Sequence, residues 1–280
     1  MAENRIDTLF SDLRASGGRA LMPFLTAGDP DLATTAALLE SAQGAGASVC
    51  EIGIPFSDPI ADGPVIQASM SRALDAGVRV DAVLDMVRGV RERLSIGLVA
   101  MVSYSIVHRL GLEAFVKRSK DAGLDGFIFP DLPLEESGPA RAAAAEAGLI
   151  LSMLIAPTTP IERAERIAAA STGFVYVVSR PGITGASAAL PEELPQRLRR
   201  LRGVTGLPMA VGFGVSSAAQ VREVVGVADA AIVGSALVKV IDQARGGDVV
   251  ARAGGFMQEL ASGLTAASPE AASPTAAPRP

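Results

Sequence analysis

Cysteine and histidine are almost absent from this sequence of 280 residues. Its single cysteine, Cys50, cannot form an internal disulfide, and a lone thiol within an apolar segment is typical of a core position in a reducing compartment. The chain also has one histidine, His108, and neither a CxxC nor an HExxH motif, which argues against a metal site built from histidine or cysteine. We expect no bound metal, and we expect His108 to lie on a helix surface without a catalytic role.

Long apolar runs and blocks of like charge are also lacking. The longest apolar runs, such as residues 96–102, are about a third of the roughly 20 residues that span a bilayer, so no transmembrane helix is predicted. The first 18 residues are polar and lack the apolar core of a secretion signal, so we expect a cytoplasmic protein. The 25 basic and 30 acidic residues are spread along the chain, which argues against a nucleic-acid or membrane surface but leaves room for a local phosphate site.

Apolar residues are plentiful, at 49% of the chain against 20% charged residues, so a large core can form. Eight short apolar segments alternate with segments of helical periodicity, a pattern typical of parallel strands joined by helices. The predicted strands are residues 20–26, 48–54, 96–102, 126–129, 149–155, 174–178, 208–211 and 230–233. The predicted helices between and after them are residues 31–43, 65–76, 81–94, 113–122, 134–147, 160–170, 191–201, 216–225 and 237–260, the last with a break at Gly246-Gly247. Eight such units form a TIM (β/α)8 barrel, the fold class we predict; an open doubly wound sheet is the alternative.

Two segments lie outside these eight units. Residues 5–15 predict an extra helix ahead of the first strand. From residue 261 onward the composition shifts to Ala, Ser, Pro and Thr, which can bury little apolar surface. We therefore predict one barrel domain over residues 1–262 and a disordered Ala/Pro-rich tail over residues 263–280.

A carboxylate lies in the middle of the second predicted strand, which begins the stretch SVCEIGIPFSDPIADGPVIQ (residues 48–67). Because side chains alternate along a strand, Glu51 shares a face with Val49 and Gly53, and in a closed barrel this face points inward. Burial of an unpaired carboxylate raises its pKa toward the range of a general acid or base. Glu51 is therefore a candidate catalytic residue; the alternative is a core carboxylate held by a buried arginine or by backbone amides.

A second carboxylate, Asp62, follows in the loop that joins this strand to the next helix. Gly63-Pro64 then opens that helix with proline in its first turn. Aspartate is a preferred N-cap residue, so Asp62 either caps the helix or joins Glu51 in a site. Spacing alone favours the cap.

Glycine together with Ser or Thr follows three successive strands. The segments SRPGITGAS (residues 179–187), VGFGVSS (211–217) and VGSALVK (233–239) come after the sixth, seventh and eighth predicted strands. Glycine lets backbone amides approach an anion, and Gly234 and Ser235 begin a helix whose N-terminus attracts one. TIM barrels commonly bind phosphate after their last two strands, so these segments predict a phosphate site.

Aromatic residues are scarce, at 4% of the chain, so their positions are informative. Five of them lie near the strand ends that carry the carboxylates and the glycine-rich segments: Phe24, Tyr104, Phe129, Tyr176 and Phe213. Ordinary core packing explains each one alone. Together they predict a flat apolar ligand between the carboxylates and the phosphate site.

Six motifs, taken together, resemble the α subunit of tryptophan synthase, over residues 5–260. They are PFLTAGDP (residues 23–30), EIGIPFSDPIADGPVIQ (51–67), DLPLEE (131–136), SRPGITG (179–185), GFGVS (212–216) and VGSALVK (233–239). The resemblance implies a barrel that cleaves indole-3-glycerol phosphate to indole and glyceraldehyde 3-phosphate without a cofactor of its own. It also implies an α2β2 complex with a β subunit that carries pyridoxal phosphate and receives the indole.

The resemblance also implies roles for individual residues. Glu51 is the acid and base of the cleavage, and Asp62 holds the indole N–H and stabilises the charge that develops on the ring. Thr184 lies on the loop that closes over the substrate in this family, and it orients Asp62. The residues that match phosphate ligands are Gly185, Gly214, Gly234 and Ser235. Those on or beside the indole pocket are Phe24, Tyr104, Tyr176 and Phe213.

Two features depart from the family pattern, the Ala/Pro-rich tail and Pro181 at the hinge of the closing loop, and neither touches the chemistry. Two alternative functions stay open at this point. One is a lyase of the same fold that releases indole without a β subunit. The other is a catalytically silent barrel that senses phosphate as a regulatory subunit.

Overall fold

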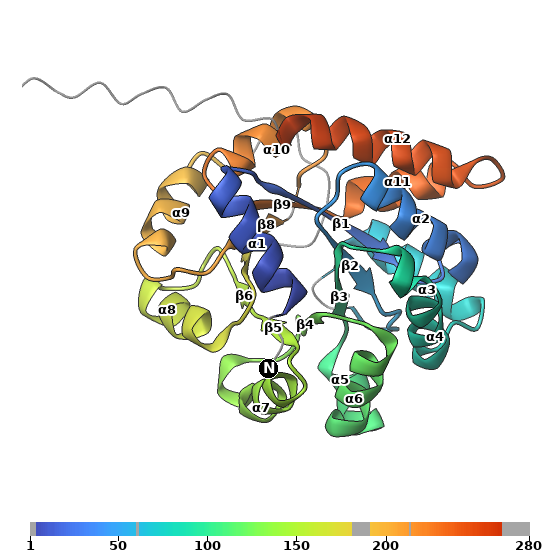
Figure 1. Ribbon diagram of the computed structural model, residues 1–280, viewed down its shortest axis with the longest axis horizontal. Coiled ribbons are helices and arrows are strands. Elements are labelled where there is room, and N and C mark those ends of the chain that lie inside the picture. Colours follow the sequence, from blue (N-terminus) through green and yellow to red (C-terminus); the bar gives the residue numbers. More distant parts are fainter. Residues whose placement is uncertain (1–3, 60–61, 181–190, 213, 265–280) are drawn as a thin grey trace, which may run out of the picture.

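The computed structural model describes residues 4–59, 62–180, 191–212 and 214–264 (Figure 1). Within these residues, nine parallel strands form one sheet in the order β5-β4-β3-β2-β1-β9-β8-β7-β6. The strands are β1 (Ala20–Thr26), β2 (Val49–Gly53), β3 (Gly97–Met101), β4 (Gly126–Ile128), β5 (Ile150–Ser152), β6 (Leu154–Ile155), β7 (Val175–Val178), β8 (Met209–Gly212) and β9 (Ala230–Val233). The helices around them are α1 (Arg5–Ser16), α2 (Leu32–Gly44), α3 (Pro64–Asp75), α4 (Val80–Val90), α5 (Tyr104–Leu110), α6 (Leu112–Ala122), α7 (Gly138–Glu146), α8 (Ile161–Ala170), α9 (Leu194–Arg202), α10 (Ala218–Val225), α11 (Ser235–Gln243) and α12 (Val249–Ala261).

The two ends of this strand order meet, because β5 and β6 are halves of one predicted strand separated by Met153 alone. The half β5 pairs with β4, and the half β6 pairs with β7. The amide of Tyr176 donates a hydrogen bond to the carbonyl oxygen of Met153 at 3.1 Å, which carries the pairing across the break. The nine strands therefore occupy eight positions of a closed ring. The predicted TIM barrel is confirmed, and the open doubly wound sheet is wrong.

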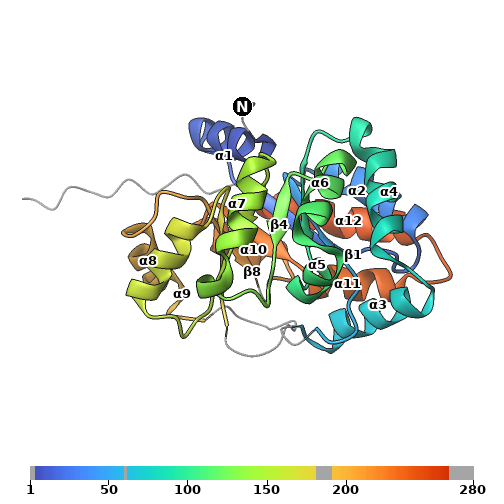
Figure 2. The ribbon, with the colours of Figure 1, turned by 90° about the horizontal axis from the view of Figure 1, so that it is seen from below.

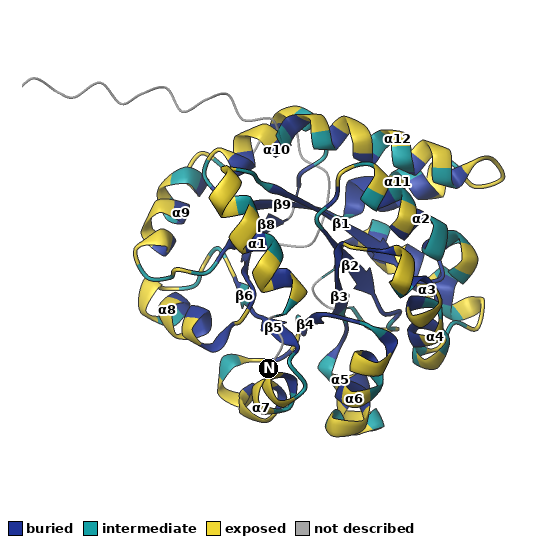
Figure 3. Cartoon of the chain, viewed as in Figure 1, coloured by how far each residue is buried: buried dark blue, intermediate teal, exposed yellow. Residues whose placement is uncertain are grey.

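Helix α1 closes the amino end of the barrel. The side chain of Asn4 caps it by accepting a hydrogen bond from the amide of Ile6. Ile6 and Phe10 are buried among the inward side chains of the strands, and the ring of Phe10 lies 6.0 Å from that of Phe174, measured between centroids. Figure 3 shows the strands as a buried centre and the helices with exposed outer faces. The extra N-terminal helix is thus confirmed, and it contributes to the core.

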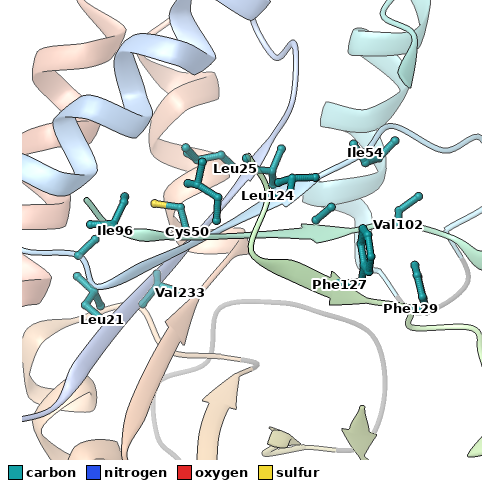
Figure 4. Packing of buried hydrophobic residues seen from close by; sticks show 14 of the residues in the cluster. Leu21, Leu25, Cys50, Ile54, Ile96, Val102, Leu124, Phe127, Phe129 and Val233 are labelled. Atoms are coloured by element: carbon teal, nitrogen blue, oxygen red, sulfur yellow. The ribbon is translucent and has the colours of Figure 1, made fainter. Parts of the chain in front are cut away.

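The outward faces of the strands pack against the surrounding helices. Cys50, Ile52 and Ile54 belong to this outer cluster, whereas Val49 belongs to the inner one, as the alternation along β2 requires. Figure 4 shows Cys50 among Leu21, Leu25 and other aliphatic side chains. Cys50 is a free, fully buried thiol, so its predicted role as a small core residue is confirmed.

Three helical predictions differ from the structure. Helix α5 was not predicted; it has seven residues, and its N-cap Ser103 accepts a hydrogen bond from the amide of Ser105. The helix predicted at residues 134–147 is a 3-10 turn, Leu134–Glu136, followed by α7, because Pro139 has no N–H to continue the hydrogen bonds of an unbroken helix. The helix predicted at residues 237–260 is two helices, α11 and α12, separated around Gly246, which has a φ of +80°.

His108 is exposed on α5, so its predicted place on a helix surface is confirmed, although this helix was not among the predicted segments. A last 3-10 turn, Ser262–Leu264, packs against α10. The predicted tail lies almost entirely outside the described residues. Among the helices of the described part of the chain, none combines the length and apolar character needed to cross a membrane.

Candidate active site

Strand β2 places Glu51 inside the barrel. In the register of the sheet, Glu51 lies between Phe24 of β1 and Val99 of β3, and the residue is 1% exposed. Neither oxygen of its carboxyl group has a hydrogen-bond partner among the described residues. Within the part of the chain that the structure describes, no arginine and no amide holds this carboxyl group, which argues against the alternative of a structural carboxylate.

Burial is the main reason why the pKa of Glu51 lies well above its ordinary value, and the charge of Asp62 raises that pKa further. A carboxyl group in this state keeps its proton to a higher pH than an exposed glutamate does. It can therefore act as an acid first and as a base once the proton has been given up.

The loop after β2 brings Asp62 to the same cavity. The N-cap of α3 is Gly63, so the interpretation of Asp62 as the cap is wrong. The backbone of Asp62 is fixed on both sides: its amide donates to the carbonyl of Pro59 at 3.2 Å, and its carbonyl accepts from Nε2 of Gln67 at 2.7 Å. Burial raises the pKa of Asp62 to about 6, so this carboxyl group is mostly ionised at neutral pH.

A cavity with an empty volume of about 530 Å³ opens between these two carboxyl groups and the start of α11. The residues that line it come from the carboxyl ends of the strands and from the loops and helices that follow: Phe24, Glu51, Asp62, Ile66, Met101, Pro130, Leu154, Tyr176, Gly214, Ile232, Gly234 and Ser235. Seven of these twelve residues were predicted from the sequence. The structure therefore brings most of the predicted site together.

The glycine-rich side of the cavity is formed by two segments. Gly214 has a φ of +96°, a conformation that glycine adopts without strain. Gly234 is the N-cap of α11 and Ser235 its first residue, so backbone N–H groups that have no partner within the helix itself lie at the cavity. This end of the cavity suits an anion such as a phosphate group.

The aromatic predictions have mixed outcomes. Phe24 and Tyr176 line the cavity. Tyr104 begins α5 and packs against Phe129 at 5.6 Å between ring centroids, so it lies outside the set of lining residues. Phe129 stacks on Phe127 in the outer cluster, where core packing explains it. The predicted residues Phe213, Thr184 and Gly185 lie outside the described part of the chain.

Sequence analysis did not single out the residues that make room for the two lining aromatics. A Cβ atom at Gly212 would lie 2.3 Å from the hydroxyl oxygen of Tyr176, and one at Gly53 would lie 2.4 Å from the ring of Phe24. Only glycine fits at either position. A glycine at the carboxyl end of a predicted strand is the signal that could have indicated them.

No group of three or more histidine, cysteine, aspartate or glutamate side chains that could hold a metal ion occurs within the described residues. Burial raises the pKa of both carboxyl groups of the cavity, and at Glu51 the charge of Asp62 adds to the rise.

The fold and the cavity together define a class of protein. It is a TIM barrel with a polar site at the carboxyl ends of its strands, the end at which enzymes of this fold carry out catalysis. The model of the family described as tryptophan synthase alpha chain matches residues 10–264. The chain belongs to this family, which identifies it as a lyase of tryptophan biosynthesis.

Individual relatives agree with this assignment. The tryptophan synthase alpha chain of Synechococcus sp. (strain CC9902) is 47% identical over 252 residues, 90% of this chain and 94% of the relative. That of Roseiflexus sp. (strain RS-1) is 46% identical over 258 residues, 92% and 99% of the two chains. Among solved structures, the tryptophan synthase subunit alpha of Legionella pneumophila str. Paris has a TM-score of 0.86 at 34% identity, covering 94% of this chain and 99% of that one. A structure of Mycobacterium tuberculosis tryptophan synthase has a TM-score of 0.86 at 35% identity, covering 94% and 98%.

Proposed function

We propose that the chain cleaves indole-3-glycerol phosphate to indole and glyceraldehyde 3-phosphate, with Glu51 and Asp62 as its catalytic residues. The observation that carries this proposal is the buried carboxyl group of Glu51, which has no hydrogen-bond partner among the described residues and faces the cavity. Burying such a group costs free energy, and a role in catalytic proton transfer would explain why the protein keeps it.

The reaction needs one proton delivered and one removed. Protonated Glu51 gives its proton to C3 of the indole ring, and the carboxylate that results accepts the proton of the side-chain hydroxyl nearest the ring. The bond from C3 to the side chain then breaks, its electrons return to the ring, and the hydroxyl carbon becomes an aldehyde. Glu51 regains its proton in the same cycle, so protons and electrons balance.

Asp62 stabilises the charge that this sequence creates. Protonation at C3 places a positive charge on the ring, and the indole N–H becomes a stronger hydrogen-bond donor. An ionised Asp62 accepts that hydrogen bond and opposes the charge, an interaction that is strongest in the transition state. Its effect should therefore fall mainly on kcat.

The two ends of the substrate are held by different parts of the cavity. We assign its phosphate to Gly214, Gly234, Ser235 and the N-terminus of α11, and its ring to the space beside Phe24 and Tyr176. This assignment rests on their position in the lining. By family resemblance, Gly185 joins the phosphate ligands, Phe213 lies at the ring pocket, and Thr184 orients Asp62 when its loop closes.

The partnership is part of the same proposal. The chain forms an α2β2 complex in the cytoplasm and passes indole to a β subunit, which carries pyridoxal phosphate; the chain itself uses no cofactor. Its family, and its similarity to a structure of tryptophan synthase from M. tuberculosis, support a β-subunit partner.

The test is the steady-state rate of indole release from indole-3-glycerol phosphate by the purified chain, alone and with excess β subunit. We expect a slow rate alone and a rise of about tenfold or more with the partner, equivalent to about 1.4 kcal/mol off the barrier. A rate indifferent to the β subunit would indicate a stand-alone lyase. No indole under either condition would contradict the proposal and favour a silent phosphate-sensing barrel.

A further inference from the structure

Two helices on one side of the barrel both begin at the cavity. Asp62 directly precedes the N-cap of α3, and Gly234 and Ser235 form the start of α11; all three residues line the cavity. The helices pack against each other and run away from the cavity in the same direction (Figure 2). The far end of each helix therefore lies away from the proposed chemistry.

Four charged side chains join these far ends, and we name this group the Asp29 cluster. Asp29, on the loop after β1, is 1% exposed in its side chain and accepts from Nε and Nη2 of Arg72 of α3 at 3.1 and 2.8 Å. Arg245, just after α11, donates to the same carboxylate. Asp242 of α11 completes the cluster, at 3.2 Å from Arg72 and 2.9 Å from Arg245.

The cluster is balanced in charge and fixed in geometry. Two arginines face two aspartates, and the buried carboxylate of Asp29 is held in a bidentate contact, the kind that restricts both partners most. Between the cluster and the cavity, α3 and α11 are joined by an apolar group formed by Phe24, Ile66, Met70 and Val238. The helix pair is thus held along its length, by apolar packing near the cavity and by ions at the far end.

From this arrangement we infer that the Asp29 cluster is a positioning element for Asp62. It sets how far α3 extends toward the cavity relative to α11, and so fixes the separation between the ring carboxylate and the phosphate-binding helix N-terminus. The inference rests on the proposed function, in which Asp62 holds the ring of the substrate and α11 its phosphate. Since a substrate held at both ends reacts only when both ends fit, a small slip of α3 lowers the rate of cleavage.

The first test is Arg72→Met, which keeps the aliphatic length of the side chain and removes the ionic contacts with Asp29 and Asp242. We expect kcat to fall about tenfold or more with KM little changed, because Asp62 acts mainly in the transition state. Binding of inorganic phosphate, measured by calorimetry, should stay at the wild-type value. The matched control is Arg163→Met. Arg163 lies on α8, across the barrel, and makes another bidentate pair with exposed Glu135 of the 3-10 turn Leu134–Glu136, so its loss should leave kcat unchanged.

The decisive measurement is the double variant Arg72→Met/Asp62→Asn. If the cluster acts through Asp62, Arg72→Met lowers kcat in the wild-type background and has little further effect once Asp62 is Asn. Additive losses, or a lower melting temperature with wild-type kcat in the folded protein, would reduce the cluster to a structural role and overturn the inference. Asp242→Asn serves if Arg72→Met does not fold, since Asp242 is 46% exposed in its side chain; the same non-additivity is expected, with a smaller loss.

Wild-type turnover separates the two proposals. If the wild-type chain releases no indole, the proposed function fails. If it releases indole and both cluster variants match its kcat, the proposed function stands and the positioning role of the cluster fails.

Discussion

Two buried carboxyl groups at opposite ends of the barrel have opposite surroundings. Asp125 lies at the amino end, just before β4, and accepts a hydrogen bond from the amide of Leu98 at 2.8 Å; the guanidinium groups of Arg91 and Arg5 lie 3.3 and 3.4 Å from its oxygens. Glu51, toward the carboxyl end, has no such partner among the described residues. One fold thus satisfies a buried carboxylate where it supports structure and leaves another unsatisfied at the cavity.

The same difference governs the two pKa values. Burial raises both, but at Asp125 the amide of Leu98 and the two arginines oppose that rise, whereas at Glu51 the charge of Asp62 adds to it. The neighbours of Asp125 therefore favour its anionic form, whereas the charge of Asp62 disfavours the anionic form of Glu51. Burial is common to the two carboxyl groups, so it does not distinguish them; the donors and charges around each one do.

The largest expected effect is on catalysis at Glu51. The change Glu51→Gln keeps the shape of the side chain and removes the transferable proton, so cleavage should fall on the order of 10³-fold while the fold is retained. The rate of indole release measures cleavage, and far-UV circular dichroism measures whether the fold is retained. Full activity in this variant would contradict both the proposed function and the contrast drawn between Glu51 and Asp125.

A smaller loss is expected at Asp62. The change Asp62→Asn leaves a side chain of the same size without the charge that stabilises the protonated ring, so kcat should fall about 10²-fold with KM little changed. Steady-state kinetics with indole-3-glycerol phosphate measure the effects on kcat and on KM separately. A loss confined to KM would mean that Asp62 binds the substrate and its transition state equally.

At Asp125 we expect a loss of stability without a loss of activity. The change Asp125→Ala leaves Arg91 and the amide of Leu98 without their carboxylate, so the free energy of unfolding should fall by about 3 kcal/mol. Urea titration measures this loss. Because this end of the barrel is far from the cavity, kcat of the folded protein at low temperature should stay at the wild-type value; a parallel loss of kcat would contradict the division between the two ends.

The smallest effect is a pH dependence of stability. Because the folded-state pKa of Glu51 is raised above the ordinary 4.5, the folded protein holds this proton more tightly than the unfolded chain. Its contribution therefore destabilises the fold as pH rises above about 4.5, by up to roughly 1.4 kcal/mol per pH unit until the folded-state pKa is reached. Relative to the wild type, Glu51→Gln should gain stability in urea titrations as the pH is raised from 4 to 8, because glutamine has no proton to lose.

A matched control for this pH series is Glu135→Gln. Glu135 is exposed, and its hydrogen bond with Arg163 lowers its pKa to about 2, so its contribution has the opposite sign and is lost as the pH falls. This variant should gain no stability with rising pH. An equal gain in both variants would show that net charge, rather than the burial of Glu51, controls the pH dependence.

Much of the fold follows from local sequence. The strands Ala20–Thr26 and Ala230–Val233 were predicted to the residue, because each is an apolar run bounded by turn residues or charge. Helix α5 was missed because seven residues are too few for a clear period, and Gly111, with a φ of +84°, ends α5 and begins α6 at a single residue. The break at Met153 could not be predicted, since it depends on which neighbour each half of the strand pairs with.

The candidate site shows the same limit. The inward direction of Glu51 followed from strand alternation, but the role of Asp62 could not be decided from spacing, because a cap and a site residue occupy the same position in the sequence. The contacts of Asp29 with Arg72 and Arg245 were missed for another reason. They join residues 43 and 216 positions apart, which only the closed barrel brings together.

The closure of the amino end by α1 limits where a substrate can enter and where products can leave. Among the described residues, the side chains of the inner cluster fill the barrel between this helix and the cavity and leave no passage along the axis. Under the proposed function, both fragments of the substrate depart by the face through which the intact molecule arrived. Both products must therefore leave through the same opening, and the slower of the two release steps limits how soon the next substrate can bind. A β subunit bound over this opening would receive the indole before the indole could reach bulk water.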